Sequence, residues 1–222
     1  MANFLDKVQP KNKAQLKSLI DHAFKHNIYD LNFIDTSKIT NMSNLFMNCE
    51  YDIDVSNWDV SNVTTTFCMF VGCKKFNSDL SNWDVSNVKN MNNMFYCCKN
   101  FDCDLSNWNV SNVTDMYSMF TACESFEGKG LDNWDVSKAE DMRFMFYNCK
   151  NFNCDLSNWD MSKALRINEM FYGCKNFEGK GLENWKLEKT LFYYDIFTGC
   201  DKVKLPSWYK AFLKRCNLEF FK

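Results

Sequence analysis

Residues 80–101 read LSNWDVSNVKNMNNMFYCCKNF, and variants of this stretch fill most of the 222-residue chain. Its tryptophan belongs to a row spaced by 25 or 26 residues: Trp58, Trp83, Trp108, Trp134, Trp159 and Trp185. The same register holds seven phenylalanines (Phe46, Phe70, Phe95, Phe120, Phe146, Phe171, Phe197) and seven cysteines (Cys49, Cys73, Cys98, Cys123, Cys149, Cys174, Cys200). A fixed period of this length is typical of a solenoid, whose repeats stack as coils around a shared core. The sequence predicts seven coils over residues 34–202.

Within each coil the spacing of apolar residues changes. Leu80, Trp83 and Val85 follow L-x-x-L-x-L spacing, which predicts a short strand with Trp83 and Val85 pointing inward. A stripe at helical spacing follows, with Ser86 as its expected N-cap: Val88, Met91, Met94, Phe95 and Cys98. The predicted fold class is an α/β solenoid: a leucine-rich-repeat-like right-handed coil with short parallel strands on one face and short helices on the other.

The two ends of such a stack need covering, because a terminal coil exposes core and unpaired backbone. Residues 11–26 have Leu16, Leu19, Ile20, Ala23 and Phe24 on one side of an amphipathic helix. Pro206-Ser207-Trp208 opens a last segment that departs from the repeat. We therefore expect an N-terminal helical cap over residues 1–33 and a C-terminal cap over residues 203–222.

Composition and charge exclude several classes of protein. The chain is 46% hydrophobic and 17% aromatic, so it is expected to fold. A formal net charge of −2, without a basic run, argues against nucleic acid as a partner. No window approaches 18 uninterrupted apolar residues, and the N-terminus has no apolar signal region, so neither a membrane span nor export of the chain as written is predicted.

Most of the twelve cysteines are expected to be free thiols shielded by packing, because seven of them share one apolar row. The alternative is disulfide linkage, between adjacent coils or across the five-residue spacings of Cys98 with Cys103 and Cys149 with Cys154. No C-x-x-C pair with a matching second pair exists, so no zinc site is predicted. No cofactor is expected.

The residue types also argue against an enzyme. His22 and His26, the only histidines, lie together near the N-terminus, which leaves no histidine-centred acid–base site within the repeats. Carboxylates recur as copies in every coil, whereas catalysis needs one singular arrangement. Two imidazoles four residues apart, without a third ligand, are expected to be solvated rather than to hold a metal.

One polar row is a candidate for binding a partner. The outward positions after the tryptophans are Asp59, Asp84, Asn109, Asp135 and Asp160. At a coil spacing of ~4.8 Å, neighbouring carboxylates repel by about 0.9 kcal/mol, and folding places no evident demand for aspartate there. We expect a monomer that binds an unidentified, basic protein partner through this row. The alternative is a structural element that self-assembles through its ends.

The repeat resembles that of the BspA-like leucine-rich-repeat surface proteins. The resemblance rests on NWDVSNV at residues 82–88, NMNNMF at residues 90–95 and FDCDL at residues 101–105, and it extends from residue 11 to about residue 200. It implies a bacterial surface or secreted protein that acts in adhesion or host interaction. The alternative location is the cytoplasm.

Overall fold

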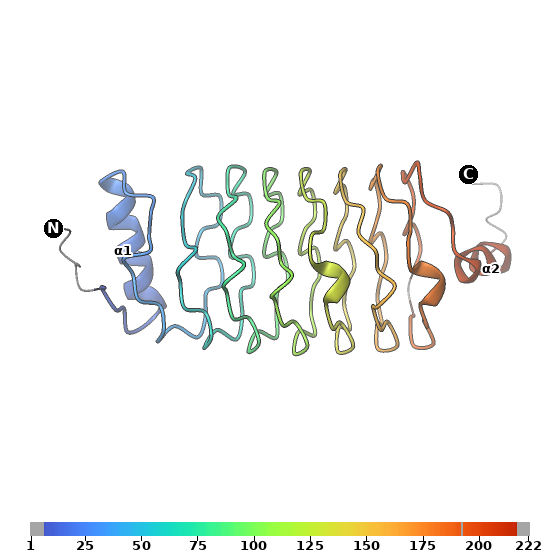
Figure 1. The fold of residues 1–222 in the computed structure, drawn as a ribbon, viewed down its shortest axis with the longest axis horizontal. Coiled ribbons are helices and arrows are strands. Elements are labelled where there is room, and N and C mark those ends of the chain that lie inside the picture. Colours follow the sequence, from blue (N-terminus) through green and yellow to red (C-terminus); the bar gives the residue numbers. More distant parts are fainter. Residues whose placement is uncertain (1–6, 192, 217–222) are drawn as a thin grey trace.

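The computed structural model describes residues 7–191 and 193–216, in which successive coils stack side by side into an elongated array (Figure 1). Helix α1 (Lys13–Lys25) lies at one end and helix α2 (Ser207–Arg215) at the other. Two single-turn 3-10 helices, η1 (Leu131–Asn133) and η2 (Leu182–Asn184), fall in the coils between them. Residues 1–6 and 217–222 of the two predicted caps lie outside the described residues.

The helix predicted near the N-terminus is present as α1. Its N-cap is Asn12, whose side chain accepts a hydrogen bond from the Gln15 N–H at 3.0 Å. Leu16, Ile20 and Ala23 are buried in the core that continues through the coils. The amphipathic pattern therefore identified both the helix and the side that it buries.

The coils themselves are built from consecutive β-turns, so the prediction of a short helix in each coil is wrong. In one coil, N–H groups bond to the carbonyl three residues earlier from Trp83 to Leu80 at 3.0 Å and from Met94 to Met91 at 3.1 Å. The only 3-10 helices in the described coils, η1 and η2, follow Gly130 and Gly181 in the two coils that carry an extra residue. Apolar residues spaced by three fit successive turns as well as a helix.

Left-handed backbone explains why no helix forms. In all seven coils the residues two before and two after the row phenylalanine have positive φ, as at Asn93 (φ 55) and Cys97 (φ 61). A right-handed helix requires φ near −63° at every residue, so two left-handed residues four apart interrupt it. Only three of these positions in the seven coils are glycine: Gly72, Gly173 and Gly199.

Neighbouring coils pair in parallel along the segment that was expected to be helical. Single-residue bridges link Asn41 to Thr65, then Asn90, Asp115, Asp141 and Arg166 in turn. The N–H groups of Met91, Asn93, Phe95 and Cys97 donate to carbonyls of the next coil at 2.8 or 2.9 Å. All four bonds point toward the C-terminal neighbour. Parallel pairing is therefore present, but it lies on this segment rather than beside the tryptophans, and the strands predicted beside the tryptophans are absent from the described coils.

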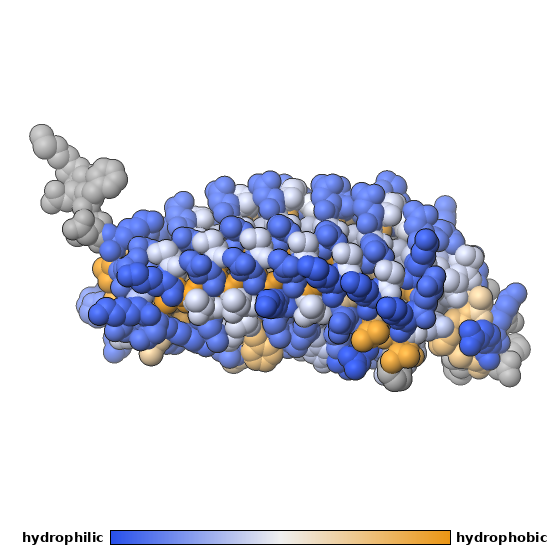
Figure 2. Space-filling view, turned by 90° about the horizontal axis from the view of Figure 1, so that it is seen from below, coloured by the Kyte–Doolittle hydropathy of each residue, from blue (hydrophilic) through white to orange (hydrophobic). Residues whose placement is uncertain are grey.

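We call the surface of these paired segments the bridged face: residues 41–48, 65–72, 90–97, 115–122, 141–148, 166–173 and 193–199. Seen from one side, hydrophilic and near-neutral residues form rows along the length of the molecule. Hydrophobic residues show between these rows and in patches toward the C-terminal end (Figure 2).

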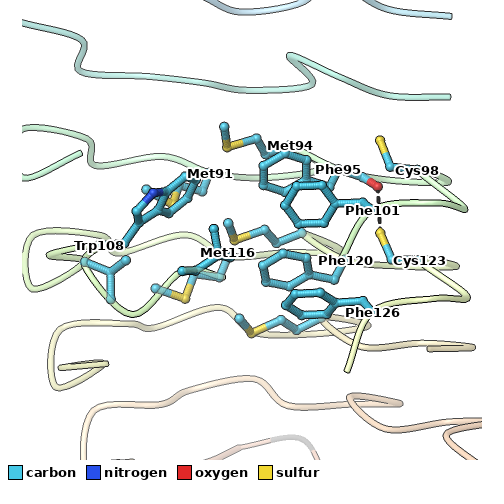
Figure 3. Packing of buried hydrophobic residues seen from close by; sticks show 14 of the residues in the cluster. Met91, Met94, Phe95, Cys98, Phe101, Trp108, Met116, Phe120, Cys123 and Phe126 are labelled. Carbon is cyan, nitrogen blue, oxygen red and sulfur yellow. Dashed lines mark hydrogen bonds between the residues drawn. The ribbon is translucent and has the colours of Figure 1, made fainter. Parts of the chain in front are cut away.

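The core is one continuous cluster made of similar layers. Phe95 stacks on Phe101 of its own coil at 4.0 Å and on Phe120 of the next coil at 5.6 Å (Figure 3). Trp83 and Trp108 stack with ring centroids 6.5 Å apart, and both are buried. The inward assignment of the tryptophan row is confirmed.

Trp208 extends the tryptophan row, although the sequence repeat ends before it. Its ring stacks on Trp185 at 6.3 Å, and its Nε1–H donates to the Leu182 carbonyl at 2.8 Å. The six tryptophans of the repeats donate in the same way to a carbonyl of the preceding coil, at 2.7 to 3.3 Å. Helix α2 thus supplies the last layer of the core.

Candidate interaction surfaces

The predicted partner-binding residues lie in one exposed line. Asp59, Asp84, Asn109, Asp135 and Asp160 are all exposed. Each follows a tryptophan of the buried row, and stacking of those rings, as between Trp108 and Trp134 at 6.3 Å, keeps the coils in register. We call this line the aspartate row.

The aspartate row has a local structural role that the sequence reasoning missed. Each side chain accepts a hydrogen bond from the N–H of the serine two residues later, as Asp84 does from Ser86 at 3.0 Å and Asn109 from Ser111 at 3.1 Å. Hydrogen bonds from these serines lower the pKa of Asp84, Asp135 and Asp160. This is an Asx-turn, so the premise that folding places no demand on the row is wrong.

The same turn recurs at two further points of the coil. Asp54, Asp79, Asp104 and Asp155 bond in this way to the serine two residues later. Asn90, Asp115 and Asp141 bond to the N–H two residues later on the bridged face. The coils that begin at Asp79 and Asp104 therefore have three Asx-turns each, and the residue between acceptor and donor is apolar and buried, as at Leu80, Val85 and Met91.

The bridged face departs from this regularity in its side chains. At its outward positions successive coils carry different residues, and most of the aromatic ones, apart from Phe67, lie from the third coil onward. We call this group the aromatic surface: Tyr96, Tyr117, Phe144, Tyr147 and Tyr172. Tyr96 is 37% exposed, and the other four are half-buried.

Four rings of the aromatic surface, those of Tyr117, Phe144, Tyr147 and Tyr172, contact one another in a chain that crosses three coils. Phe144 meets Tyr117 edge-on at 5.6 Å and Tyr147 at 5.9 Å. Tyr147 stacks on Tyr172 of the following coil at 4.8 Å, with 10° between the ring planes. Pairs of this geometry are favourable beyond the area they bury, so the rings hold each other in place at the surface.

The guanidinium of an arginine of the chain lies over one of these rings. The Arg143 guanidinium carbon lies 5.0 Å from the centre of the Tyr117 ring. The same guanidinium pairs with Asp141, at 2.6 Å from its Nη2 to Oδ2 and 2.9 Å from its Nε to Oδ1. Asp141 is also 3.7 Å from Arg166, so this carboxylate is shared between two cations.

The next two coils carry carboxylates without such cations. Among the ion pairs of the described residues, neither Glu169 nor Asp195 has a partner. Burial and the nearby Asp195 raise the pKa of Glu169. Burial raises the pKa of Tyr147, and Tyr172 and Glu169 add to that effect. The stacked tyrosines are therefore bordered by negative charge.

The cysteines form a thiol ladder inside the core. The thiol of Cys123 donates to the Phe95 carbonyl of the preceding coil at 3.0 Å, and Cys73, Cys98, Cys149, Cys174 and Cys200 repeat the bond at 2.9 or 3.0 Å (Figure 3). All twelve cysteines are free thiols. Burial raises the pKa of Cys103 to about 11 and those of Cys154 and Cys200 to about 12. The hydrogen bonds of the ladder link each coil to the one before it, which gives these thiols a structural role.

The His22 and His26 rings stand 4.4 Å apart on the end helix, where His26 Nδ1 lies 2.9 Å from the His22 carbonyl. Within residues 7–191 and 193–216, no three His, Cys, Asp or Glu side chains are grouped to hold a metal. In that same part of the chain, no helix has the length and apolar character needed to cross a membrane.

Stacked coils of about 25 residues, with parallel bridges and one continuous core, define a leucine-rich-repeat-like solenoid. The chain belongs to the family described as "Mycoplasma protein of unknown function, DUF285", whose model matches residues 14–130 and 98–210. No curated protein matches the chain.

Two solved structures are similar at low identity. The leucine-rich repeat protein of T. pallidum has a TM-score of 0.49 and 16% identity, over 82% of this chain and 78% of that chain. The TLR13–ssRNA13 complex has a TM-score of 0.32 and 14% identity, over 89% of this chain and 31% of that chain.

Proposed function

We propose that the chain is a non-enzymatic protein-interaction module that binds its partner with the outer surface of the solenoid. The observation that carries this proposal is the aromatic surface, where side chains differ between coils although the backbone and core beneath them repeat. Packing of the core does not require tyrosines at these outward positions. Tyrosine and arginine are enriched at protein interfaces, and solenoids use their extended faces for binding.

The aspartate row is the second proposed binding surface. Its carboxylates are exposed and follow one line, and they would favour a basic partner by raising the association rate. The hydrogen bond to serine uses one carboxylate oxygen, which leaves the other to face a partner. The resemblance to BspA-like surface proteins supports adhesion or host binding as the setting.

Two sets of substitutions show which of the two surfaces binds the partner. The chain is immobilised and proteins are captured from host-cell extract, using the parent, a Tyr147→Ala/Tyr172→Ala variant and an Asp59→Asn/Asp84→Asn/Asp135→Asn/Asp160→Asn variant. We expect the same protein to be captured by the parent and lost with the tyrosines. Loss only with the aspartates would assign binding to the aspartate row, and equal capture by all three would remove both surfaces.

Self-assembly through the ends is the other candidate function. Helices α1 and α2 cover parts of the two terminal coils, while Leu191 and Tyr194 of the last coil are 67% and 51% exposed. Sedimentation velocity across a hundredfold range of concentration decides this point. A monomer throughout is expected for the interaction module, and filaments or dimers that grow with concentration would favour assembly.

A further inference from the structure

We propose that the aromatic surface binds arginine side chains of a basic segment in its partner, with Tyr147 and Tyr172 contacting the guanidinium and Glu169 and Asp195 pairing with it. This inference rests on the proposed interaction function and names the chemistry of the partner.

The Arg143 site provides an example of the same recognition within the chain. There a guanidinium lies over the Tyr117 ring at 5.0 Å and is paired with the Asp141 carboxylate. The negative face of a tyrosine ring attracts a cation, and a carboxylate matches the planar fork of a guanidinium. Both parts are supplied by one face of the solenoid.

The following coils repeat the rings and carboxylates, and their arginine, Arg166, lies against Asp141 of the preceding coil rather than against Glu169 or Asp195. Tyr147 and Tyr172 present a stacked pair, and Glu169 precedes Tyr172 by three residues, within the same turn. Asp195 lies at the position of Glu169 in the next coil and is exposed. Within the described residues no Lys or Arg pairs with either carboxylate, although Asp195 accepts a hydrogen bond from the Thr198 hydroxyl at 3.2 Å.

Charge and shape favour arginine over other occupants. An anionic ligand, including nucleic acid, would meet carboxylates and the negative faces of rings. Lysine carries the same charge, but its ammonium is a compact, strongly hydrated point charge that neither stacks on a ring nor pairs in a fork. The occupant that uses both the rings and the carboxylates is therefore a guanidinium.

Binding of defined peptides to the intact chain tests the proposal. Fluorescent twelve-residue peptides of alternating Arg–Gly, Lys–Gly and Glu–Gly are titrated by anisotropy in 150 mM NaCl. We expect the arginine peptide to bind about tenfold more tightly than the lysine peptide, and the glutamate peptide not to bind. Equal affinity for the arginine and lysine peptides would overturn the proposal, because it would reduce binding to net charge.

Variants locate the site. Tyr172→Leu removes the ring but keeps an apolar side chain, and Glu169→Gln removes the charge; each is expected to weaken arginine-peptide binding about tenfold. Glu50→Gln, the same change of charge at an exposed residue of the first coil outside both proposed surfaces, is the matched control and is expected to change it less than twofold. Equal loss in the control overturns the assignment. Protein capture that depends on Tyr147 and Tyr172, without binding of the arginine peptide, would leave the interaction function standing and refute only the arginine chemistry.

Discussion

The indole of Trp108 combines packing with a hydrogen bond that secures a turn. Its ring lies between those of Trp83 and Trp134, and its Nε1–H donates to the Leu80 carbonyl at 2.9 Å. The same carbonyl also closes a turn of its own coil by accepting from the Trp83 N–H at 3.0 Å, so the indole adds a second hydrogen bond to it. A smaller apolar residue would fill less of the core and remove this second hydrogen bond, leaving the Leu80 carbonyl with the Trp83 N–H as its donor.

Trp108→Ala is therefore expected to lower the free energy of unfolding by ~3–5 kcal/mol, measured by urea denaturation. Trp208→Ala is expected to cost less, because that ring is only half-buried, even though it makes the same hydrogen bond. A change below about 1 kcal/mol at Trp108 would contradict the role assigned to the row.

Substitutions of Asp84 test how much the side-chain oxygen that accepts the Ser86 N–H stabilises the turn. Asp84→Asn keeps the acceptor for the Ser86 N–H, as Asn109 does naturally, and is expected to change stability by less than about 0.5 kcal/mol. Asp84→Ala removes the acceptor and is expected to cost about 1 kcal/mol. Thermal unfolding of the two variants side by side measures the difference.

The pH dependence of the same turn has a defined sign. Since hydrogen bonds from Ser86 lower the pKa of Asp84, its contribution is present above the unfolded-state pKa and is lost as the pH falls through the folded value. Asp84→Asn should therefore be less sensitive to acid than the parent between pH 5 and pH 3. Identical acid profiles would show that the carboxylate is not stabilised in the folded coil.

At the scale of the coil, the left-handed residues set the path of the backbone. Ala122 (φ 58) and Gly173 (φ 72) occupy the same position in two coils, two residues after the row phenylalanine. An alanine with positive φ is strained, whereas a glycine adopts it without a steric penalty. A Cβ at Gly173 would also collide with the side-chain oxygen of Asn148.

Opposite substitutions at these two positions should have opposite effects. Ala122→Gly is expected to raise the free energy of unfolding by about 0.5 kcal/mol or leave it unchanged, because relief of strain is offset by the greater freedom of the unfolded chain. Gly173→Ala is expected to lower it by ~1–2 kcal/mol. Urea midpoints of both variants provide the measurement, and a stabilising Gly173→Ala would refute the assignment.

The sequence predicted the coils, the inward tryptophans and the first helix, because these depend on period and polarity alone. It failed between Val88 and Cys98, where spacing by three is shared by helices and by chains of turns. The informative residues were Asn93 in this stretch and Asn148 in a later coil, since asparagine tolerates left-handed backbone. The D-x-S pattern around Asp84 indicated a turn in the same way.

The sequence did not predict the aromatic surface, because the predicted binding residues were those that recur in nearly every coil. Tyr147 and Tyr172 recur in only part of the array, and Arg143 and Phe144 have no equivalents in neighbouring coils. Their proximity depends on the register of the bridges, which sequence spacing alone does not place on the surface. Variation among repeats at exposed positions was the available signal.

At the scale of the whole molecule, buried thiols couple stability to alkaline pH. The pKa values of Cys103, Cys154 and Cys200 are about 11, 12 and 12, above the unfolded value near 8.5, since burial disfavours the thiolate. A group whose pKa is raised by folding stabilises the fold fully below its unfolded pKa. That contribution falls as the pH rises toward the folded value.

Each such thiol is expected to reduce the free energy of unfolding by up to about 1.4 kcal/mol per pH unit above pH 8.5. Urea unfolding at pH 7.5, 9 and 10, with reductant present, measures the slope, and Cys154→Ala should make it shallower. A parent whose stability does not change from pH 7.5 to pH 10 would show that the thiols are not buried as protonated groups.

The one-way bonds of the bridged face also determine how the molecule responds to force. They join each coil to the next along the length of the array, whose described ends lie far apart (Figure 1). A load applied between those ends acts on the coils in series, so the junction at a loaded end opens first. Each coil of about 25 residues that detaches releases roughly 85 Å of extended chain. The stack should therefore behave as an extensible tether that lengthens in equal steps rather than rupturing at once.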